Sequence, residues 1–281
     1  MKLASTIEDI RREVSGARLQ GKSIGFVPTM GYLHEGHLSL IRKSKSENSY
    51  VVVSIFVNPT QFGAGEDYET YPRNMSQDIK LCEMAGADIV FHPTAEQMYP
   101  DNFNTNVVVA GLTEGLCGAS RPGHFNGVAT VVTKLFNIVK PDRAYFGQKD
   151  AQQVAVIQQM SRDLNMEVQV IPCAIVREAD GLAMSSRNTY LNPEERNAAL
   201  VLSKSLLRAE ELLAEGVTCP SKLRQAIEGF IAEEPLASID YVEIVNAESL
   251  KAVRELKGDI LVAVAVKIGK TRLIDNIRLK V

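Results

Sequence analysis

Two histidines, His34 and His37, lie three residues apart in the stretch Pro28 to Leu38, which reads PTMGYLHEGHL. The apolar run from Ile24 to Val27 before it predicts a buried strand, and the residues after it predict a helix. In a strand, glycine-bearing turn and helix arranged in this order, free backbone N–H groups and the helix dipole face a phosphate. Gly36 between the histidines allows close approach of a ligand to the backbone. We interpret the stretch as a candidate phosphate-binding turn.

Three roles can be considered for the two histidines. Both imidazoles can donate to phosphate oxygens as negative charge builds up in a transition state. Metal ligation is the second role, but the zinc-protease helix needs His-Glu-x-x-His, whereas these histidines are three apart with a glycine between them. The third role is that of two solvated loop residues. The phosphate and plain-loop interpretations both stay open on these residues alone.

The composition limits the class of protein. The chain has 281 residues, of which 45% are hydrophobic and 23% charged, as in an ordinary globular protein. Its net charge of −3 gives no general attraction for nucleic acid, and no apolar run is long enough to span a membrane. The amino-terminal residues lack a signal-peptide core, and the cysteines do not form a Cys-x-x-Cys pair. We therefore expect a cytoplasmic protein with reduced thiols at Cys82, Cys117, Cys173 and Cys219.

The first part of the chain alternates apolar runs with helical patterns. This alternation predicts an α/β fold, a Rossmann-like doubly wound parallel sheet. The predicted strands are 24–28, 50–57, 87–91, 143–146 and 168–172. The predicted helices are 5–18, 37–47, 75–85, 128–139 and 150–164, and the segment from Arg121 to Phe125 is a predicted loop.

The pattern changes after residue 176. Asn192-Pro193-Glu194-Glu195 is a helix start, with an asparagine cap and a proline in the first turn. A helical stripe follows up to Gly216, and a second helix covers 221–233. Strands are predicted at 239–245, 260–268 and 272–279. We therefore divide the chain into a domain of residues 1–175 and a smaller α+β C-terminal domain of residues 176–281.

Several polar segments follow the predicted strands. Ligands of such sheets lie at the carboxyl ends of strands, so we expect the histidine turn and the Asn58–Gln61 loop to share a crevice. Gly147 to Asp150, with Gln153 after it, follows another strand. Met184 to Arg187 is polar and suits a mobile clamp, whose serine hydroxyls and arginine fork fit phosphate oxygens. Each segment also has a plain alternative: a helix cap, a surface loop or, for Arg121 and His124, a rim.

Four of these segments together resemble the signature segments of the pantothenate synthetase family. They are PTMGYLHEGH from Pro28, FVNPTQF from Phe56, GQKDAQQ from Gly147 and MSSRN from Met184, and RPGHF from Arg121 and YPR from Tyr71 also fit. The resemblance runs from near the N-terminus to the last predicted strands. It extends to the wider nucleotidyltransferase group that includes class I aminoacyl-tRNA synthetases.

The resemblance implies the ligation of (R)-pantoate to β-alanine, driven by cleavage of ATP to AMP and pyrophosphate, through a pantoyl-adenylate. It implies a homodimer in the cytoplasm, with Mg2+ bound together with ATP. The implied catalytic residues are His37, the usual proton donor of the family, and His34, Lys149 and Arg187. The implied ATP-binding residues are Met30, Gly31, Tyr32, Leu33, His34, Glu35, Gly36, His37, Gly147, Gln148, Lys149, Asp150, Val176, Met184, Ser185, Ser186 and Arg187. The implied residues for pantoate and β-alanine are Gln61, Gln153 and Asn58.

The metal ligands are not defined by the resemblance. Where members of the family can carry adjacent acidic residues, this chain has Gln77-Asp78, so Asp78 is the only candidate partner of the metal, directly or through water. We assign no protein ligand to the metal. Two other functions compete with ligation: a nucleotidyltransferase that uses a phosphorylated acceptor, and a non-catalytic nucleotide sensor. The neutral Asn58–Gln61 loop argues against the first, and the intact histidines and Lys149 argue against the second.

Overall fold

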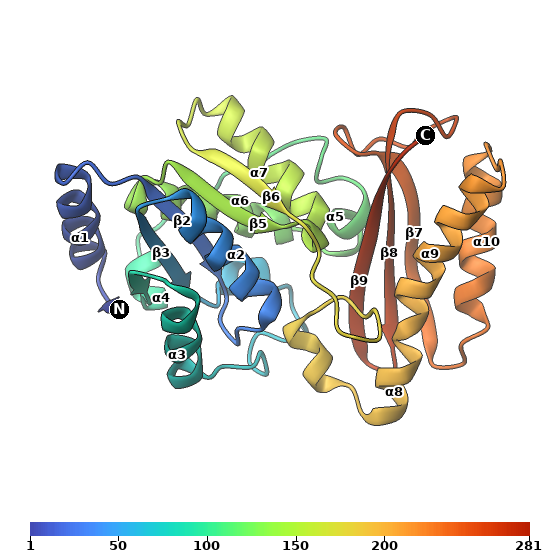
Figure 1. Cartoon of the computed structure of the whole chain (residues 1–281), viewed down its shortest axis with the longest axis horizontal. Helices are drawn as coiled ribbons and strands as arrows, with labels where there is room; N and C mark the ends of the chain where they lie inside the picture. Colours follow the sequence, from blue (N-terminus) through green and yellow to red (C-terminus); the bar gives the residue numbers. More distant parts are fainter. The chain divides into compact units, whose positions relative to one another are not determined.

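A computed structural model describes all residues, 1–281. The chain folds into two compact units (Figure 1). The first unit comprises Met1–Ala110, Arg121–Gln148 and Val156–Ala174. The second comprises Gly111–Ser120, Lys149–Ala155 and Ile175–Val281. The second unit therefore takes two short segments from within the predicted first domain.

The first unit is built on a six-stranded parallel sheet in the order β1-β4-β3-β2-β5-β6. Its strands are β1 (Lys2–Ala4), β2 (Ile24–Thr29), β3 (Tyr50–Ile55), β4 (Ile89–Phe91), β5 (Arg143–Gly147) and β6 (Gln169–Cys173). The strand order reverses at β2, which pairs with β3 on one side and with β5 on the other. Ligands of doubly wound sheets bind at this switch point. The predicted α/β class is confirmed, and the histidine turn follows the strand at the switch point.

Helices cover both faces of this sheet (Figure 1). They are α1 (Ile7–Leu19), α2 (Glu35–Glu47), α3 (Met75–Ala85), α4 (Ala95–Met98) and α6 (His124–Val139), while α7 (Ala151–Asp163) begins in the second unit. Val27 packs with side chains of α2 and α3 on one face. The neighbouring Phe26 points to the other face, where its ring lies edge-on to Phe136 of α6 with centroids 6.4 Å apart. Successive residues of a strand alternate between the faces of a sheet, so β2 is buried from both sides.

Gly25 brings α2 close to the switch-point strand. A Cβ atom at this position would lie 2.2 Å from Ser44 Oγ and 2.7 Å from Asn48 Nδ2. Asn48 in turn donates to the Tyr145 hydroxyl of β5 over 2.7 Å. The absence of a side chain at Gly25 therefore seats the helix that carries His37 against β2.

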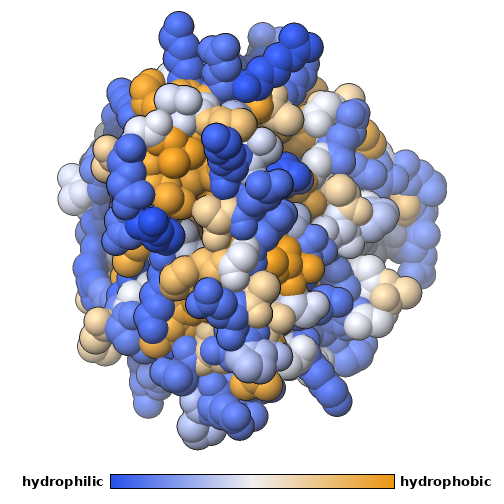
Figure 2. Space-filling view, turned by 90° about the vertical axis from the view of Figure 1, so that its right-hand side faces the viewer, coloured by the Kyte–Doolittle hydropathy of each residue, from blue (hydrophilic) through white to orange (hydrophobic).

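The second unit is a three-stranded antiparallel sheet in the order β7-β8-β9, formed by Ala237–Asn246, Asp259–Ile268 and Thr271–Lys280. Its helices are α5 (Leu116–Ser120), α8 (Pro193–Ala198), α9 (Leu200–Ala214) and α10 (Pro220–Ala232). Leu206 of α9 and Ile227 of α10 pack on Val264 of β8, and all three are buried. The predicted α+β character of this part is confirmed. Figure 2, which views the side with α9 and α10, shows mainly hydrophilic side chains with apolar surface in separate areas.

The chain departs from our predicted boundaries at two helices. Helix α6 begins at His124 rather than at residue 128, because Gly123 adopts a left-handed conformation (φ +83°) and turns the chain into the helix. The predicted loop from Arg121 to Phe125 is therefore wrong at its end, and Phe125 is buried. The predicted long helix after Asn192 is divided into α8 and α9 at Ala199. No helix is both long and apolar enough to cross a membrane.

Candidate active site

His34 and His37 stand at the amino-terminal end of α2, directly after the switch-point strand. His34 is the N-cap of the helix and His37 is the third residue of its first turn. Their rings are stacked at a tilt, with centroids 4.1 Å apart. The backbone N–H of His34 donates to His37 Nδ1 over 3.3 Å. This contact makes Nδ1 an acceptor, so a neutral His37 carries its proton on Nε2 and can donate from that atom.

The turn before the helix is held by Asp78 of α3. The two oxygens of this carboxylate accept the backbone N–H groups of Tyr32, over 2.8 Å, and of Leu33, over 2.7 Å. Burial raises the pKa of Asp78, and these two hydrogen bonds act in the opposite direction. Gly31 adopts φ +87°, and a Cβ atom there would lie 3.0 Å from both Asp78 Oδ2 and Ile55. The geometry of the histidine turn therefore depends on a glycine and a buried carboxylate.

Asp78, the candidate partner of the metal, is buried and already hydrogen-bonded in this structure. The residue is only 1% exposed, and both oxygens are engaged by the backbone of the turn. Asp78 serves as the support of the turn in this structure. No group of three or more His, Cys, Asp or Glu side chains is arranged to hold a metal ion.

In the second polar segment the buried Asn58 is hydrogen-bonded to the half-buried Gln61. Asn58 is the N-cap of the 3-10 helix η1 (Pro59–Gln61), Gln61 is the last residue of that helix, and Asn58 is 1% exposed. Its Oδ1 accepts the Tyr99 hydroxyl over 2.8 Å, and its Nδ2 donates to Gly127 O over 3.2 Å and to Gln61 Oε1 over 3.3 Å. Asn58 thus supports Gln61, and its own contact with a substrate stays a prediction.

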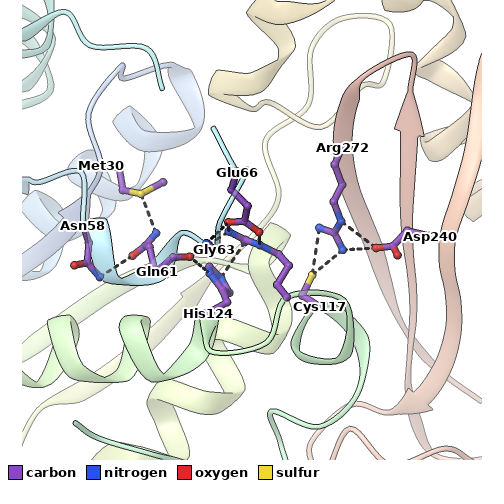
Figure 3. A network of polar contacts seen from close by, with 10 residues as sticks. Met30, Asn58, Gln61, Gly63, Glu66, Cys117, His124, Asp240 and Arg272 are labelled. Carbon is purple, nitrogen blue, oxygen red and sulfur yellow. Dashed lines mark hydrogen bonds and ion pairs between the residues drawn. The ribbon is translucent and has the colours of Figure 1, made fainter. Parts of the chain in front are cut away.

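Gln61 joins the second segment to the first. Its Nε2 lies 2.9 Å from Met30 Sδ, as Figure 3 shows. Thioether sulfur is a weak acceptor, so a substrate oxygen can replace it without a large loss. The structure therefore brings together the predicted ATP-binding turn and the predicted pantoate-binding residue within the first unit.

The remaining predicted site residues lie in two segments. Apart from Gly147 and Gln148, which belong to the first unit, these residues are part of the second unit. The 3-10 turn η2 (Gln148–Asp150) follows Gly147 and leads into α7. Lys149 Nζ lies 3.4 Å from Asp150, and Asn276 of β9 donates to the Lys149 carbonyl over 2.9 Å. Gln153 is half-buried in the first turn of α7.

The segment from Val176 to Arg187 forms a compact hairpin with its own hydrogen bonds. The Met184 N–H donates to Val176 O over 3.0 Å, which joins two predicted ATP-binding residues. Arg177 pairs with the buried Asp275 of β9 over 2.6 Å, and Leu182 is buried in the core of the second unit. Ser185 caps the 3-10 helix η3 (Ser186–Tyr190), which includes Ser186 and Arg187. The mobility of this segment stays a prediction.

Sequence reasoning missed one charged residue beside Gln61. Glu66 pairs with Arg121 over 2.5 Å, and Arg121 contacts the Gln61 backbone. The partners are 55 residues apart, and Glu66 lies in a Gly-Ala-Gly-Glu segment that has the composition of a solvated loop. Nothing in the local sequence distinguishes this half-buried residue from an exposed acid.

Known proteins match the chain over its whole length. The family model of pantoate-beta-alanine ligase matches residues 2–278. A pantothenate synthetase of Acetivibrio thermocellus is 60% identical over 281 residues and covers 100% of both chains.

Two crystal structures are also similar. Pantothenate synthetase from Thermus thermophilus has a TM-score of 0.93 at 46% identity and covers 99% of each chain. The pantoate-beta-alanine ligase of Francisella tularensis, complexed with beta-gamma ATP and beta-alanine, has a TM-score of 0.82 at 37% identity and covers 99% of this chain and 97% of that one. This chain therefore belongs to the pantoate-beta-alanine ligase family.

Proposed function

We propose that this chain condenses (R)-pantoate with β-alanine through a pantoyl-adenylate and releases AMP and pyrophosphate. The observation that carries the proposal is the full-length family match, together with the pair of histidines at the start of α2. The complex of the Francisella relative with an ATP compound and β-alanine supports the same substrates here.

The chemistry of the reaction explains why these residue types are needed. A carboxylate is a poor electrophile, so the acid must first acquire a good leaving group. In the first step an oxygen of the pantoate carboxylate bonds to the α-phosphorus of ATP. The bond between the α-phosphorus and the oxygen that links it to the β-phosphorus breaks, which releases pyrophosphate. In the second step the neutral amine of β-alanine attacks the carbonyl carbon. AMP leaves with the carboxylate oxygen that had joined the acid to the phosphorus, and the amine nitrogen loses a proton.

The first step moves negative charge onto the leaving pyrophosphate. His37 can donate from Nε2, and the amino-terminal end of α2 adds backbone N–H groups and a positive dipole end. We assign the same task to His34, Lys149 and Arg187. We assign Gln61 and Gln153 to pantoate, and Gln61 also to β-alanine. Mg2+ would arrive with ATP as part of the substrate and would be held mainly by phosphate oxygens and water, as is usual for this ion.

Transfer of a nucleotide to a phosphorylated acceptor fits the site less well. A phosphate on the acceptor would require a basic pocket beside the substrate residues. The cation that contacts the Gln61 segment is Arg121, whose charge is already matched by Glu66. Gln61 and Asn58 are neutral amides, which suit a small hydroxy acid.

Product analysis tests the proposed function. The purified chain is incubated with pantoate, β-alanine and Mg-ATP, and the products are identified by mass spectrometry, with each substrate omitted in turn. We expect pantothenate, AMP and pyrophosphate in equal amounts, and none when a substrate is missing. Formation of ADP and phosphate, or no pantothenate at all, would overturn the proposal. Exchange of labelled pyrophosphate into ATP that requires pantoate but not β-alanine would support two separate steps.

We also propose, from the family resemblance, that the chain is a homodimer, and, from its composition and net charge, that it is cytoplasmic and has no nucleic-acid partner. Light scattering of the purified chain tests the assembly, with a mass of twice 30.8 kDa expected. A mass of 30.8 kDa across the working concentration range would refute the dimer.

A further inference from the structure

The backbone carbonyl of Gln61 is held from two directions. His124 Nδ1 donates to this oxygen over 2.7 Å, as Figure 3 shows. Arg121 Nη2 donates to the same oxygen over 3.3 Å. Both donors come from the RPGHF segment at the start of α6, which the proposed reaction does not otherwise use. A carbonyl with two donors of fixed direction has little freedom to rotate, and the side chain of the same residue shares that constraint.

Arg121 is itself fixed by Glu66. Its Nε donates to Oε1 over 2.7 Å and its Nη2 donates to Oε2 over 2.5 Å, a two-point contact that sets the plane of the guanidinium. Glu66 Oε2 also accepts the Gly63 backbone N–H over 3.2 Å, which closes the loop after η1. Burial raises the pKa of Glu66, but the hydrogen bonds and charge of Arg121 outweigh it, so the net pKa is lowered. Glu66 is therefore ionised at neutral pH.

The same guanidinium selects one form of the His124 ring. Arg121 Nη1 lies 3.2 Å from His124 Nε2 and can only donate, so Nε2 must present its lone pair. The ring proton is then on Nδ1, which is the atom that donates to the Gln61 carbonyl. Arg121 therefore donates both to Glu66 and to His124, and His124 donates to the Gln61 carbonyl, so the three residues form a connected network that ends on Gln61.

We infer that Glu66, Arg121 and His124 are positioning residues that fix the side-chain amide of Gln61 for pantoate. This inference rests on the proposed function, in which Gln61 binds that substrate. The three residues act through the backbone of Gln61 and need no contact with the substrate. Their loss should therefore weaken the use of pantoate while the use of ATP, assigned to other residues, changes little.

Substitutions of His124 separate positioning from general structural support. His124→Ala removes the donor to Gln61, and we expect kcat/KM for pantoate to fall by about tenfold, the effect of one lost hydrogen bond of about 1.4 kcal/mol. His124→Asn keeps an N–H group near the place of Nδ1 and should restore most of that loss. Arg121→Lys should resemble the alanine variant, because a point charge cannot make the fork to Glu66 and also donate to Gln61.

A double-mutant cycle with Gln61→Ala tests the route of action. If His124 acts through the Gln61 amide, His124→Ala should add less than about twofold to the loss already caused by Gln61→Ala. Pantoate binding, measured by calorimetry with an α,β-methylene analogue of ATP, supplies the same cycle for variants that turn over too slowly. Arg208→Ala removes another Arg–Glu pair, on the exposed side of α9, and serves as the control that should change neither value.

The outcomes separate this inference from the proposed function. No pantothenate from the unaltered chain would refute the proposed function itself. Normal pantothenate formation with additive losses in the cycle, or with equal losses for pantoate and ATP, would refute the positioning role. Failure of His124→Asn to recover pantoate use in a chain that melts normally would also refute it.

Discussion

Gly127 is the point at which helix α6 touches the segment that carries Gln61. A Cβ atom on Gly127 would lie 2.2 Å from the Thr60 carbonyl oxygen, 2.5 Å from its carbon and 2.7 Å from Gln61 Cα. Ordinary contacts of this kind are about 3.5 Å long. Gly127→Ala therefore requires the two backbones to separate by about 1 Å, and no side-chain rotation can relieve the overlap.

Two effects of Gly127→Ala destabilise the folded state and one stabilises it. Overpacking of a rigid neighbour costs about 1–3 kcal/mol. Separation also strains the hydrogen bond from Asn58 Nδ2 to Gly127 O, worth about 1 kcal/mol. The better helix propensity of alanine returns about 1 kcal/mol. We expect a net destabilisation of about 1–3 kcal/mol and, because the displaced segment contains Gln61, a fall in kcat/KM for pantoate of about tenfold or more.

Gly16→Ala is the matched control for this prediction. Gly16 also lies inside a helix of the first unit, but a Cβ atom there has nothing within 4 Å. The control should melt at the same or a slightly higher temperature and keep full activity. Thermal unfolding and pantoate kinetics of the two variants make the comparison. Equal melting temperatures and equal activities for Gly127→Ala and Gly16→Ala would refute the reasoning.

Other predictions concern the histidine turn and the phosphate-binding residues. Asp78→Asn leaves one backbone N–H of the turn facing an amide N–H, and should cost about 1–3 kcal/mol of stability in denaturation experiments. Burial raises the pKa of Asp78, so the folded protein holds the carboxyl proton more tightly than the unfolded chain does. The resulting contribution to the free energy of unfolding is greatest at low pH and is lost as the pH rises through the raised pKa. The difference in free energy of unfolding between wild type and Asp78→Asn should therefore decrease as the pH rises from about 4. An increase of this difference with pH would contradict the prediction. His37→Ala should lower kcat by about 100- to 1,000-fold. The variant should still fold but lose about 1 kcal/mol of stability, because the His34 backbone N–H loses its acceptor at the helix start. Stoichiometric zinc in protein purified without metal would contradict the phosphate role of His37. Arg187→Lys should lower kcat/KM for ATP by about tenfold, since the fork is lost, and a value equal to wild type in steady-state kinetics would argue against that contact.

The main elements of the fold follow from local sequence patterns. Continuous apolar runs located β2 and β3 to within two residues, because strands buried on both faces need no polar alternation. Strand β1 was missed, since it has three residues and two of them are exposed. The start of α6 was missed because Gly123 enters the helix in a left-handed conformation, which the sequence Arg-Pro-Gly does not distinguish from a turn.

The candidate site was predictable as segments but not as a network. The phosphate-binding interpretation of His34 and His37 depended on a strand, a turn and a helix that are contiguous in sequence. The supports of the site are distant in sequence: Asp78 holds a turn 45 residues earlier, and Glu66 pairs with Arg121 across 55 residues. Composition cannot show that a polar residue is buried against backbone N–H groups, so such roles appear only when the chain is folded.

The most direct test of the proposed chemistry follows the oxygen atoms of pantoate. Pantoate labelled with oxygen-18 in both carboxylate positions is converted in the presence of β-alanine and Mg-ATP, and the products are analysed by mass spectrometry. Our account predicts one labelled oxygen in AMP and one in the amide of pantothenate, because the oxygen that joins acid and phosphorus leaves with AMP. Unlabelled AMP, or label in inorganic phosphate together with ADP, would contradict the pantoyl-adenylate.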